Sequence, residues 1–300
     1  MTAAVGEVPQ RIAVVGLGQM GGGIARNLHA AGLLAGAYDL NQEALLDSGL
    51  ARAIPFGPVS ELVQSCDIIL FATLTTQQVG ASIRGFEVPS GRIIIDVTTS
   101  DPQQSRLLSE ELVAKGVHYI DAAMTGGAAG ADAGTLTLMV GGRDEVVASC
   151  RCVFDAIANK VFHLGPAGSG HAMKLVHNLI LHSSFLAACE GLRLAERAGL
   201  NVAQAVDVLN AGNARSFVTD TRFPRDILSG TMDARSTISN LEKDLGLAVD
   251  FGGRLDARIP YAQLTRSLLA KALDAGEKDT DFSWLYPLYE ALAQNLEARE

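Results

Sequence analysis

Short runs of β-branched and other apolar residues alternate with helical patterns over residues 1–165. We predict strands, in chain order, for RIAVVGLG, GAYDL, DIILFAT, RIIIDVTT, VHYIDAAM, TLTLMVGG and VFHLGPAG. Helical stretches lie between them, among them MGGGIARNLHAAG, NQEALLDSG, SELVQSC and DPQQSRLLSEELVAKG. Because strands that alternate with helices at this spacing form βαβ units, the pattern predicts a parallel sheet buried between helices.

The pattern becomes helical throughout after Gly165. A single helical pattern extends from Ser169 to about Ala198, which makes a helix roughly 45 Å long. Further helices are predicted for NVAQAVDVLNAG, SNLEKDLGLAVDFGG, PYAQLTRSLLAKALDAG and WLYPLYEALAQNLEA, with no β-rich stretch among them. We therefore predict an α/β domain of residues 1–167 and an all-helical domain of residues 168–300, joined by a long interdomain helix.

The composition describes a compact, aliphatic-rich protein and limits its partners. Of the 300 residues, 48% are hydrophobic and 19% are charged, and the formal net charge is −9. This charge offers no general attraction to nucleic acid or to an anionic membrane, so we expect neither as a partner. A small anionic substrate would need a local positive site.

Cysteine usage and the lengths of the apolar runs favour a cytoplasmic protein. The N-terminus MTAAVGEVPQR lacks the basic region and apolar run of a signal peptide. Every apolar segment is interrupted before about 18 residues, so no membrane span is expected. No disulfide framework, CxxC pair or other cluster with metal-ligand spacing is present, so we expect reduced thiols and no metal. The four cysteines are Cys66, Cys150, Cys152 and Cys189.

A glycine-rich turn follows the first predicted strand and opens the first helix. Gly16 permits a tight turn, Gly18 lets the backbone approach a pyrophosphate, and Gly21 allows close packing of helix against strand. The helix N-terminus then presents unpaired N–H groups to the phosphates. In this context the motif predicts a Rossmann-type domain that binds a dinucleotide.

Asp39 ends the second predicted strand, at the spacing expected of a residue that accepts hydrogen bonds from the adenosine ribose. Its charge would repel a 2′-phosphate, and Asn41 and Gln42 follow it where an arginine would favour NADP. NAD is therefore the expected cofactor, and NADP the less favoured one. The alternative for Asp39 is an N-cap of the helix NQEALL.

Four separated motifs together resemble the β-hydroxyacid dehydrogenase family, which includes 3-hydroxyisobutyrate dehydrogenase and tartronate semialdehyde reductase. They stand in the family's order, and the match extends over nearly the whole chain. They are GLGQMGGGIARNLHAAG, DAAMTGGAAGADAGTLTLMVGG, GPAGSGHAMKLVHN and NLEKDLGLAVD. The resemblance implies hydride transfer between a nicotinamide cofactor and a small hydroxy acid.

The resemblance also implies a role for each matching residue. Lys174 matches the family's catalytic lysine, and Asn178 matches an asparagine that holds the substrate beside it. The implied substrate-binding residues are Thr125, Gly126 and Gly127 for the carboxylate, with His177 and Asp244. The implied cofactor contacts are Gly16, Leu17, Gly18, Gln19, Met20, Gly21, Asp39, Leu74, Thr75, Thr99 and Lys243.

Elementary chemistry supports the roles of Lys174 and Asn178 independently of the family resemblance. Lys174 and Asn178 are four residues apart, so they project from one face of the long helix, which we expect to line a cleft between the domains. A lysine whose pKa is lowered toward neutrality can accept the proton of an alcohol as hydride leaves the carbon. Asn178 can hold the lysine and the hydroxyl in line. The alternative is a lysine that keeps its ammonium in water.

In the turn of residues 125–127 a hydroxyl and two glycine N–H groups can converge on a carboxylate, although an ordinary glycine-rich turn is the alternative. His177 is either a substrate contact or a hydrogen-bonded helix histidine. KLVHN is also similar to the corresponding segment of 6-phosphogluconate dehydrogenases, but Leu181 stands where those enzymes have a glutamate acid. We therefore expect oxidation without decarboxylation. His171 and His182 are expected to be structural or interfacial.

Two departures bear on the substrate. Where the family has DAPVSGG this chain has DAAMTGG, which makes the lip of the pocket more apolar. Arg215, Arg222 and Arg225 follow in a region that borders the active site in relatives. Each could bind a second anionic group, but solvated surface arginines are the expectation.

The expected reaction is NAD-dependent oxidation of the primary alcohol of a small, 3-hydroxyisobutyrate-like 3-hydroxy acid, or its reverse. The alternatives are a tartronate semialdehyde (2-hydroxy-3-oxopropionate) reductase and a dehydrogenase of a sulfonate analogue. A non-catalytic dinucleotide-binding module and an imine reductase are less consistent with Lys174 and the TGG turn. Because the long helix is apolar on more than one face, a homodimer or homotetramer is expected.

Overall fold

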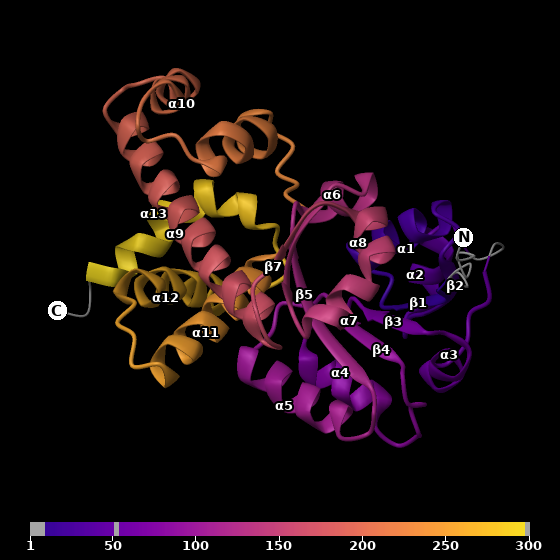
Figure 1. The fold of residues 1–300 in the computed structure, drawn as a ribbon. Coiled ribbons are helices and arrows are strands. Elements are labelled where there is room, and N and C mark those ends of the chain that lie inside the picture. The colour runs from indigo at the N-terminus through magenta and orange to yellow at the C-terminus, as the bar shows by residue number, and fades with distance from the viewer. Residues whose placement is uncertain (1–9, 51–53, 298–300) are drawn as a thin grey trace, which may run out of the picture. The chain divides into compact units, whose positions relative to one another are not determined.

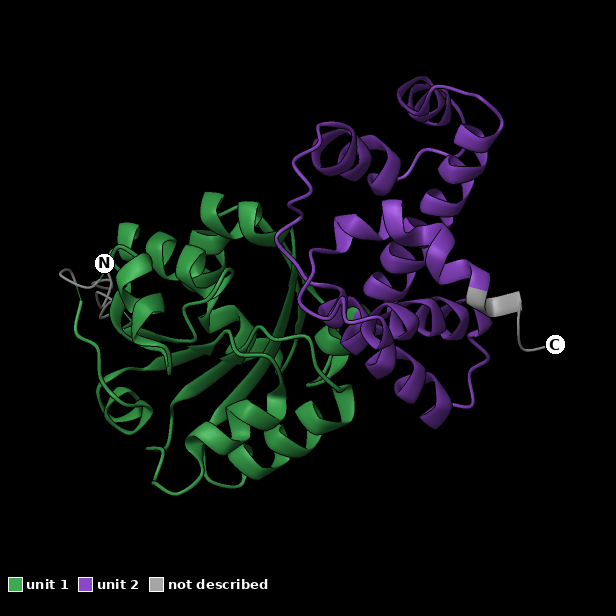
Figure 2. Ribbon diagram, turned by 180° about the vertical axis from the view of Figure 1, so that it is seen from behind, with its two compact units in different colours: residues 1–174 green, residues 175–300 purple. Residues whose placement is uncertain are grey.

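The computed structural model describes residues 10–50 and 54–297, which divide into two compact units, 1–174 and 175–300 (Figure 2). Residues 1–9, most of the segment used above to argue against a signal peptide, lie outside the described residues. Each unit has its own hydrophobic core. Among the described residues, no helix is both long and apolar enough to cross a membrane.

Unit 1 is built on a seven-stranded sheet, in the order β2-β1-β3-β4-β5-β6-β7 (Figure 1). Its strands are β1 (Ile12–Val15), β2 (Leu34–Tyr38), β3 (Ile68–Phe71), β4 (Ile93–Asp96), β5 (His118–Thr125), β6 (Leu136–Gly141) and β7 (Ala158–His163). Each overlaps a predicted run, but β2 and β7 begin before the runs GAYDL and VFHLGPAG and end within them. Strands β1, β3 and β4 are buried at every position. This is the burial expected of central strands covered on both faces.

The sheet departs from the predicted parallel arrangement at one pair. All neighbouring strands are parallel except β5 and β6, which pair antiparallel with Asp121 opposite Gly141 and Thr125 opposite Thr137. A parallel crossover needs a dozen or more residues, whereas only the short helix α6 (Gly127–Ala133) joins β5 to β6. The chain therefore turns back on itself after the TGG segment.

Two helical layers cover the sheet (Figure 1). Alternate strand residues such as Ile12 and Val14 face one core, and Ala13 and Val15 face the other. The first core is completed by α1 (Gly21–Ala30), α6, α7 (Asp144–Ser149) and α8 (Arg151–Ile157), and Ala44 and Leu45 of α2 (Gln42–Asp47) pack against it. The second is completed by α3 (Val59–Ser65), α4 (Thr76–Ile83) and α5 (Pro102–Val113).

Unit 2 is helical, as predicted. Helix α9 (Ser169–Arg197) begins in unit 1 and continues through unit 2. It is followed by α10 (Val202–Ala211), the π-helical segment η1 (Val218–Leu228), α11 (Ile238–Arg254), α12 (Pro260–Asp274), the short η2 (Phe282–Trp284) and α13 (Leu285–Glu297). An aromatic cluster of Phe185, Phe223, Phe282 and Tyr286 lies in the core. The segment η1 has no counterpart in the sequence prediction.

Candidate active site and cofactor site

The glycine-rich turn has the geometry that its sequence predicts. Gly16 has φ +91°, and a Cβ there would lie 2.7 Å from the carbonyl oxygen of Ala72. A Cβ on Gly21 would lie 1.9 Å from the carbonyl oxygen of Gly16, whereas one on Gly18 would meet no atom within 4 Å. Gly16 and Gly21 are thus required by the turn itself. Gly18 leaves open space at the surface of the loop, as a close approach by a phosphate requires.

Asp39 holds this turn to the end of β2. Its Oδ2 accepts a hydrogen bond from the backbone N–H of Leu17 at 2.6 Å, and its Oδ1 accepts from Asn41 N–H at 2.8 Å. The N-cap of α2 is Asn41, whose side chain accepts from Glu43 N–H. The alternative that Asp39 caps this helix is therefore wrong. Its carboxylate lies beside the glycine turn.

A cavity of about 710 Å³ opens beside the turn, wholly within unit 1. Gly16, Gly18 and Asp39 line one part of it, and Leu74 and Phe86 line another. An acidic group next to open backbone N–H groups and apolar walls suits a ribose, a pyrophosphate and a flat ring. The residues present therefore fit a dinucleotide.

The other predicted cofactor residues of unit 1 lie around the ends of β1, β3 and β4. Gln19 is exposed in the glycine turn, and Met20, the N-cap residue of α1, packs on the first core. Thr75 is the N-cap of α4, where its hydroxyl accepts from Gln78 N–H at 3.3 Å. Thr99 is half-buried just beyond β4.

The segment predicted to hold the substrate carboxylate ends β5. Thr125 is the last residue of the strand and is half-buried. Gly126 and Gly127 have φ +124° and +63°, and both are exposed. Positive φ values of this kind favour glycine, and they leave the backbone N–H groups of an exposed turn without covering side chains, where an anion can approach them. The turn is therefore chemically able to hold a carboxylate.

Lys174 and Asn178 lie on one continuous helix, α9. Lys174 is half-buried, and Asn178 is buried with only 4% of its surface exposed. Their spacing of four residues puts them on neighbouring turns of the same helix face.

Asn178 belongs to a polar cluster in unit 2. Its Nδ2 donates to Oδ2 of Asp244 on α11 at 2.6 Å, and its Oδ1 lies 2.9 Å from Nδ1 of His177. Nζ of Lys243 lies 3.1 Å from Oδ1 of Asp244, and Nε2 of His182 lies 3.7 Å from its Oδ2. Asp244, predicted to bind substrate, is thus a buried anchor for the asparagine as well.

The three arginines near η1 are paired within unit 2. Arg222 donates to Oδ2 of Asp226 at 3.1 Å, and its guanidinium lies 5.2 Å from the ring centroid of Phe282. Arg225 binds both oxygens of the same carboxylate, and Arg215 pairs with Asp220. The expectation of a solvated surface residue is wrong for Arg222, whose side chain is only 16% exposed, because it stacks in the aromatic core. Burial lowers the pKa of Arg222.

The sequence interpretation missed a buried polar network beneath the start of α9. Oδ2 of Asp96 accepts from Thr76 Oγ1 at 2.7 Å and from the hydroxyl of Tyr119 at 2.8 Å. The Nδ1 of His171 lies 2.6 Å from Ser105 Oγ, and its Nε2 lies 3.9 Å from Oδ1 of Asp96. All of these side chains are buried. An acidic residue inside an apolar run, as in RIIIDVTT, was the available signal.

A second carboxylate, Asp121, lies in the interior of β5 and is fully buried. It accepts hydrogen bonds from the backbone N–H groups of Gly168 and His171 at 2.7 and 2.9 Å. Burial raises the pKa of Asp121, and the charge of His171 and the two N–H groups oppose that rise. Burial and the nearby charge of Asp96 also raise the pKa of Tyr119. In the part of the chain that the structure describes, no group of three or more His, Cys, Asp or Glu side chains could hold a metal ion.

Comparison with known proteins identifies the family. A family model described as the NAD binding domain of 6-phosphogluconate dehydrogenase matches residues 11–165. Another, described as NAD-binding of NADP-dependent 3-hydroxyisobutyrate dehydrogenase, matches residues 168–289. The chain belongs to the β-hydroxyacid dehydrogenase family. The resemblance seen in the sequence is thereby confirmed, together with NAD(P)-binding domains.

Relatives within this family carry several substrate names. The chain is 30% identical over 293 residues to mitochondrial 3-hydroxyisobutyrate dehydrogenase of Drosophila melanogaster, which covers 93% of this chain and 89% of that protein. It is 30% identical over 286 residues to L-threonate dehydrogenase of Cupriavidus necator, covering 93% and 96%. The structure of Mycobacterium tuberculosis 3-hydroxyisobutyrate dehydrogenase with L-serine matches with a TM-score of 0.84 at 27% identity, covering 93% and 98%. The fold of the β-hydroxyacid dehydrogenases is thus established for the 93% of the chain that this comparison covers.

Proposed function

We propose that this β-hydroxyacid dehydrogenase oxidises the primary alcohol of a small 3-hydroxy acid such as 3-hydroxyisobutyrate, or reduces the corresponding aldehyde, with NAD. The nicotinamide cofactor supplies the hydride acceptor when it is bound. Lys174 takes the alcohol proton in oxidation and returns it in reduction. Asn178 orients the hydroxyl, and His177 also contacts the substrate. The substrate carboxylate is held by Thr125, Gly126 and Gly127.

The observation that carries this proposal is the pairing of Lys174 and Asn178 on α9, with Asn178 anchored by Asp244. A carboxylate that accepts from the amide Nδ2 fixes Oδ1 of Asn178 as the acceptor; one of its two lone pairs lies toward Nδ1 of His177, and the second can accept from a hydroxyl or an ammonium. A buried asparagine with a fixed orientation is suited to hold a reacting hydroxyl in line, since catalysis depends on positioning. No comparable reason exists for this arrangement in a module that only binds a dinucleotide.

Asp39 supports the preference for NAD over NADP. Its carboxylate lies on the cavity beside the glycine turn, where a 2′-phosphate would meet a negative charge. We propose that the turn residues 16–21 bind the pyrophosphate. We also propose that Leu74, Thr75, Thr99 and Lys243 contact the cofactor.

The arginine pairs support a monocarboxylate substrate. Arg215, Arg222 and Arg225 each have a carboxylate partner within unit 2, so a second anionic group on the substrate would have to compete for them. A small acid with one carboxylate and one alcohol needs only the TGG turn and Lys174. The name of the Cupriavidus relative makes L-threonate the second substrate to test.

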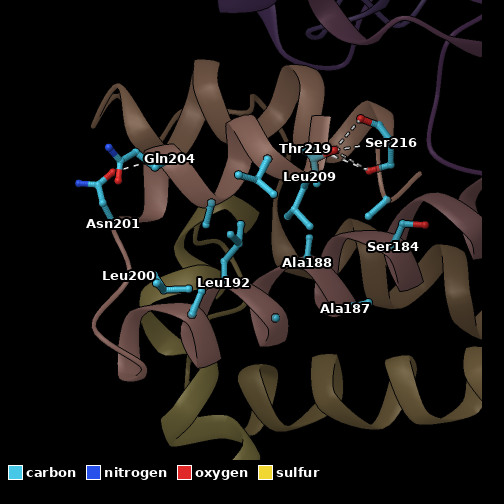
Figure 3. Close-up of a pocket in the computed structure, with 15 residues that line it drawn as sticks. Ser184, Ala187, Ala188, Leu192, Leu200, Asn201, Gln204, Leu209, Ser216 and Thr219 are labelled. Carbon is cyan, nitrogen blue, oxygen red and sulfur yellow. Dashed lines mark hydrogen bonds between the residues drawn. The ribbon is translucent and has the colours of Figure 1, made fainter. Parts of the chain in front are cut away.

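An apolar groove of about 700 Å³ in unit 2 supports a homodimer or homotetramer (Figure 3). It lies among α9, α10 and η1, and small residues line its α9 side: Ser184, Ala187, Ala188, Gly191 and Ala195. On or beside the groove Leu200 and Val208 are 59% and 71% exposed. Apolar surface of this extent is typically covered by a partner, and we propose a second copy of this chain. A monomer by light scattering at micromolar concentration would contradict this proposal.

We propose that residues 1–167 form the dinucleotide-binding domain and residues 168–300 the substrate and oligomerisation domain, and that the protein is cytoplasmic. The net charge of −9 supports a small-molecule role with no nucleic acid or membrane partner.

The decisive test is a substrate screen. Purified protein is mixed with NAD or NADP and with 3-hydroxyisobutyrate, L-threonate, L-serine, glycerate or a 3-hydroxy sulfonate, and nicotinamide absorbance is followed. The proposal predicts the highest kcat/KM for 3-hydroxyisobutyrate with NAD. If only L-threonate or only the sulfonate is turned over, that compound replaces 3-hydroxyisobutyrate as the proposed substrate. If none of the hydroxy acids is turned over, the proposed dehydrogenase function is refuted.

A further inference from the structure

The first turn of α9 is capped by a residue from a distant strand. A side chain at the N-cap position often satisfies the first N–H groups of a helix. Here the carboxylate of Asp121, in the interior of β5, accepts from the N–H groups of Gly168 and His171. A negative charge at this end of a helix is also favoured by the helix dipole. The position of α9 is therefore tied to β5.

Glycines let the helix approach the sheet closely enough for this contact. A Cβ on Gly170 would lie 2.3 Å from the carbonyl oxygen of Met139 and 2.9 Å from that of Asp121. A Cβ on Gly141, which pairs with Asp121 across the sheet, would lie 2.6 Å from Oδ1 of Asp121 and 2.9 Å from Ser169 N. The backbone of the first turn thus lies directly on β5 and β6, with no side chain between them.

The side chain of His171 adds a second attachment to the same turn of the helix. Its ring is fully buried, its Nδ1 lies 2.6 Å from Ser105 Oγ on α5, and its Nε2 faces Asp96 at the end of β4. Among the described residues that Nε2 has no hydrogen-bond partner. Helix α5 of unit 1 therefore holds, through Ser105, the side chain that precedes Lys174 by three residues.

The contact between α9 and β5 also links Lys174 to the TGG turn, because Lys174 lies on α9 and the turn follows from β5. Three residues of helix separate His171 from Lys174, a rise of about 4.5 Å. Asp121 and Thr125 are on one strand four residues apart, so they point to the same face at a spacing of about 13 Å. A shift of the first helical turn would therefore move the lysine relative to the turn proposed to hold the substrate carboxylate.

We propose that Asp121 is a positioning residue for Lys174: its carboxylate sets the height and rotation of the first turns of α9 against the strand that ends in Thr125. The inference rests on the proposed function for its effect on catalysis, but the positioning itself can be measured without substrate. Ser105 assists by holding His171.

The test compares Asp121→Asn with Asp281→Asn. An asparagine at 121 keeps the size of the side chain but loses the charge and offers one acceptor oxygen for two N–H groups. Asp281 is the matched control, because its carboxylate also accepts from two backbone N–H groups, those of Ser236 and Ser283, in unit 2. Both variants are first checked for folding by their melting temperatures.

Two measurements on these variants need no activity. Reductive methylation of Lys174 is followed by peptide mass spectrometry, with the exposed Lys160 as internal reference, and amide exchange is followed over residues 168–174. We expect Asp121→Asn to change the Lys174 to Lys160 labelling ratio by about threefold or more and to speed exchange in this segment. Asp281→Asn should change neither. Unchanged labelling and exchange in folded Asp121→Asn would overturn the proposal.

Kinetics then separates positioning from a purely structural role. Because a displacement of about 1 Å can cost about 100-fold, Asp121→Asn should lower kcat by about 10- to 100-fold per folded site. KM and the Kd for NAD should stay within about threefold, as expected for an interaction realised only in the transition state. A loss confined to NAD affinity, or a kcat equal to that of the unaltered enzyme, would overturn the proposal.

If Asp121→Asn does not fold, the Ser105→Ala variant tests the positioning of Lys174 in its place. Removing the hydroxyl leaves the buried His171 ring without its partner, and we expect altered Lys174 labelling and a kcat lower by about 3- to 10-fold. Unchanged labelling and kcat in this variant would overturn the proposal. If the unaltered protein turns over no hydroxy acid, the proposed function fails, while the labelling and exchange results still decide the positioning.

Discussion

Asn178 and Asp244 are joined by a hydrogen bond of 2.6 Å in which the amide Nδ2 donates to the carboxylate Oδ2. Both side chains are buried, and Lys243 and His182 face the same carboxylate. Because an amide nitrogen can only donate and a carboxylate can only accept, this contact sets the rotation of the Asn178 amide. This bond therefore fixes which atom of Asn178 is available to a substrate.

Asp244→Asn should impair catalysis more than folding. The substitution replaces a charge-assisted hydrogen bond by a neutral one and allows the Asn178 amide to rotate. We expect kcat to fall by about 10- to 100-fold with NAD affinity nearly unchanged. The control is Asp250→Asn, an exposed position on the same helix, which should behave as the unaltered enzyme. Equal kinetics for the two variants would contradict the assigned role.

Gly18 and Gly21 should respond differently to alanine. At Gly21 a Cβ would collide with the backbone of Gly16, and overpacking of this kind costs about 1–3 kcal/mol of unfolding free energy. At Gly18 there is free space, so Gly18→Ala should leave the melting temperature unchanged and weaken NAD binding by about tenfold or more. Thermal unfolding and NAD titration measure the two effects. Normal NAD binding by folded Gly18→Ala would argue against a pyrophosphate at this loop.

Removal of the charge at Asp39 should relax the cofactor preference. We expect Asp39→Ser to lower the ratio of kcat/KM with NAD to that with NADP by about tenfold or more, since a 2′-phosphate would no longer meet a carboxylate. Because Asp39 also holds Leu17, some loss of affinity for both cofactors is expected. Asp47→Asn, an exposed change on α2, is the control. If this ratio of kcat/KM values is unchanged in Asp39→Ser, Asp39 does not determine the preference for NAD over NADP.

The four free cysteines should differ sharply toward a thiol reagent. Cys152 is exposed, whereas Cys66, Cys150 and Cys189 are buried. Burial raises the pKa of Cys150 to about 12, so at pH 8 only about one molecule in 10⁴ carries its thiolate, the reactive form. Ellman's reagent at pH 8 should therefore titrate one thiol in the folded protein and four after denaturation. Rapid reaction of a second thiol, or of Cys152→Ser, would show that the cores open readily.

Much of the architecture could be predicted from periodicity. The runs of β1, β3 and β4 are buried and rich in β-branched residues. The long pattern from Ser169 has neither glycine nor proline after its first turn until Gly191, so each of these patterns predicts its element with little ambiguity. The reversal of β6 was not predicted, because strand direction depends on the length of a connection whose helical content, α6, was not recognised. The π-helical η1 was also missed, since Pro224 argues against a regular helix.

The candidate site was predictable where a motif carries chemistry in its spacing. Gly16, Gly18 and Asp39 belong to this class, and so does the pair on α9. Asp121 and Asp96 were missed because each is joined to its partners by contacts between segments far apart in the chain. A carboxylate inside a buried strand predicts only that a partner exists. The identity of that partner, here the first turn of α9, depends on the folded structure.

The central claim is that Lys174 exchanges the proton of the reacting alcohol. The direct measurement is the turnover of Lys174→Ala with the best hydroxy acid of the screen, beside the Kd for NAD from fluorescence titration. The account predicts a kcat lower by about 10²- to 10⁴-fold with NAD affinity within about threefold of the unaltered enzyme. Unchanged turnover in a folded Lys174→Ala variant would contradict it.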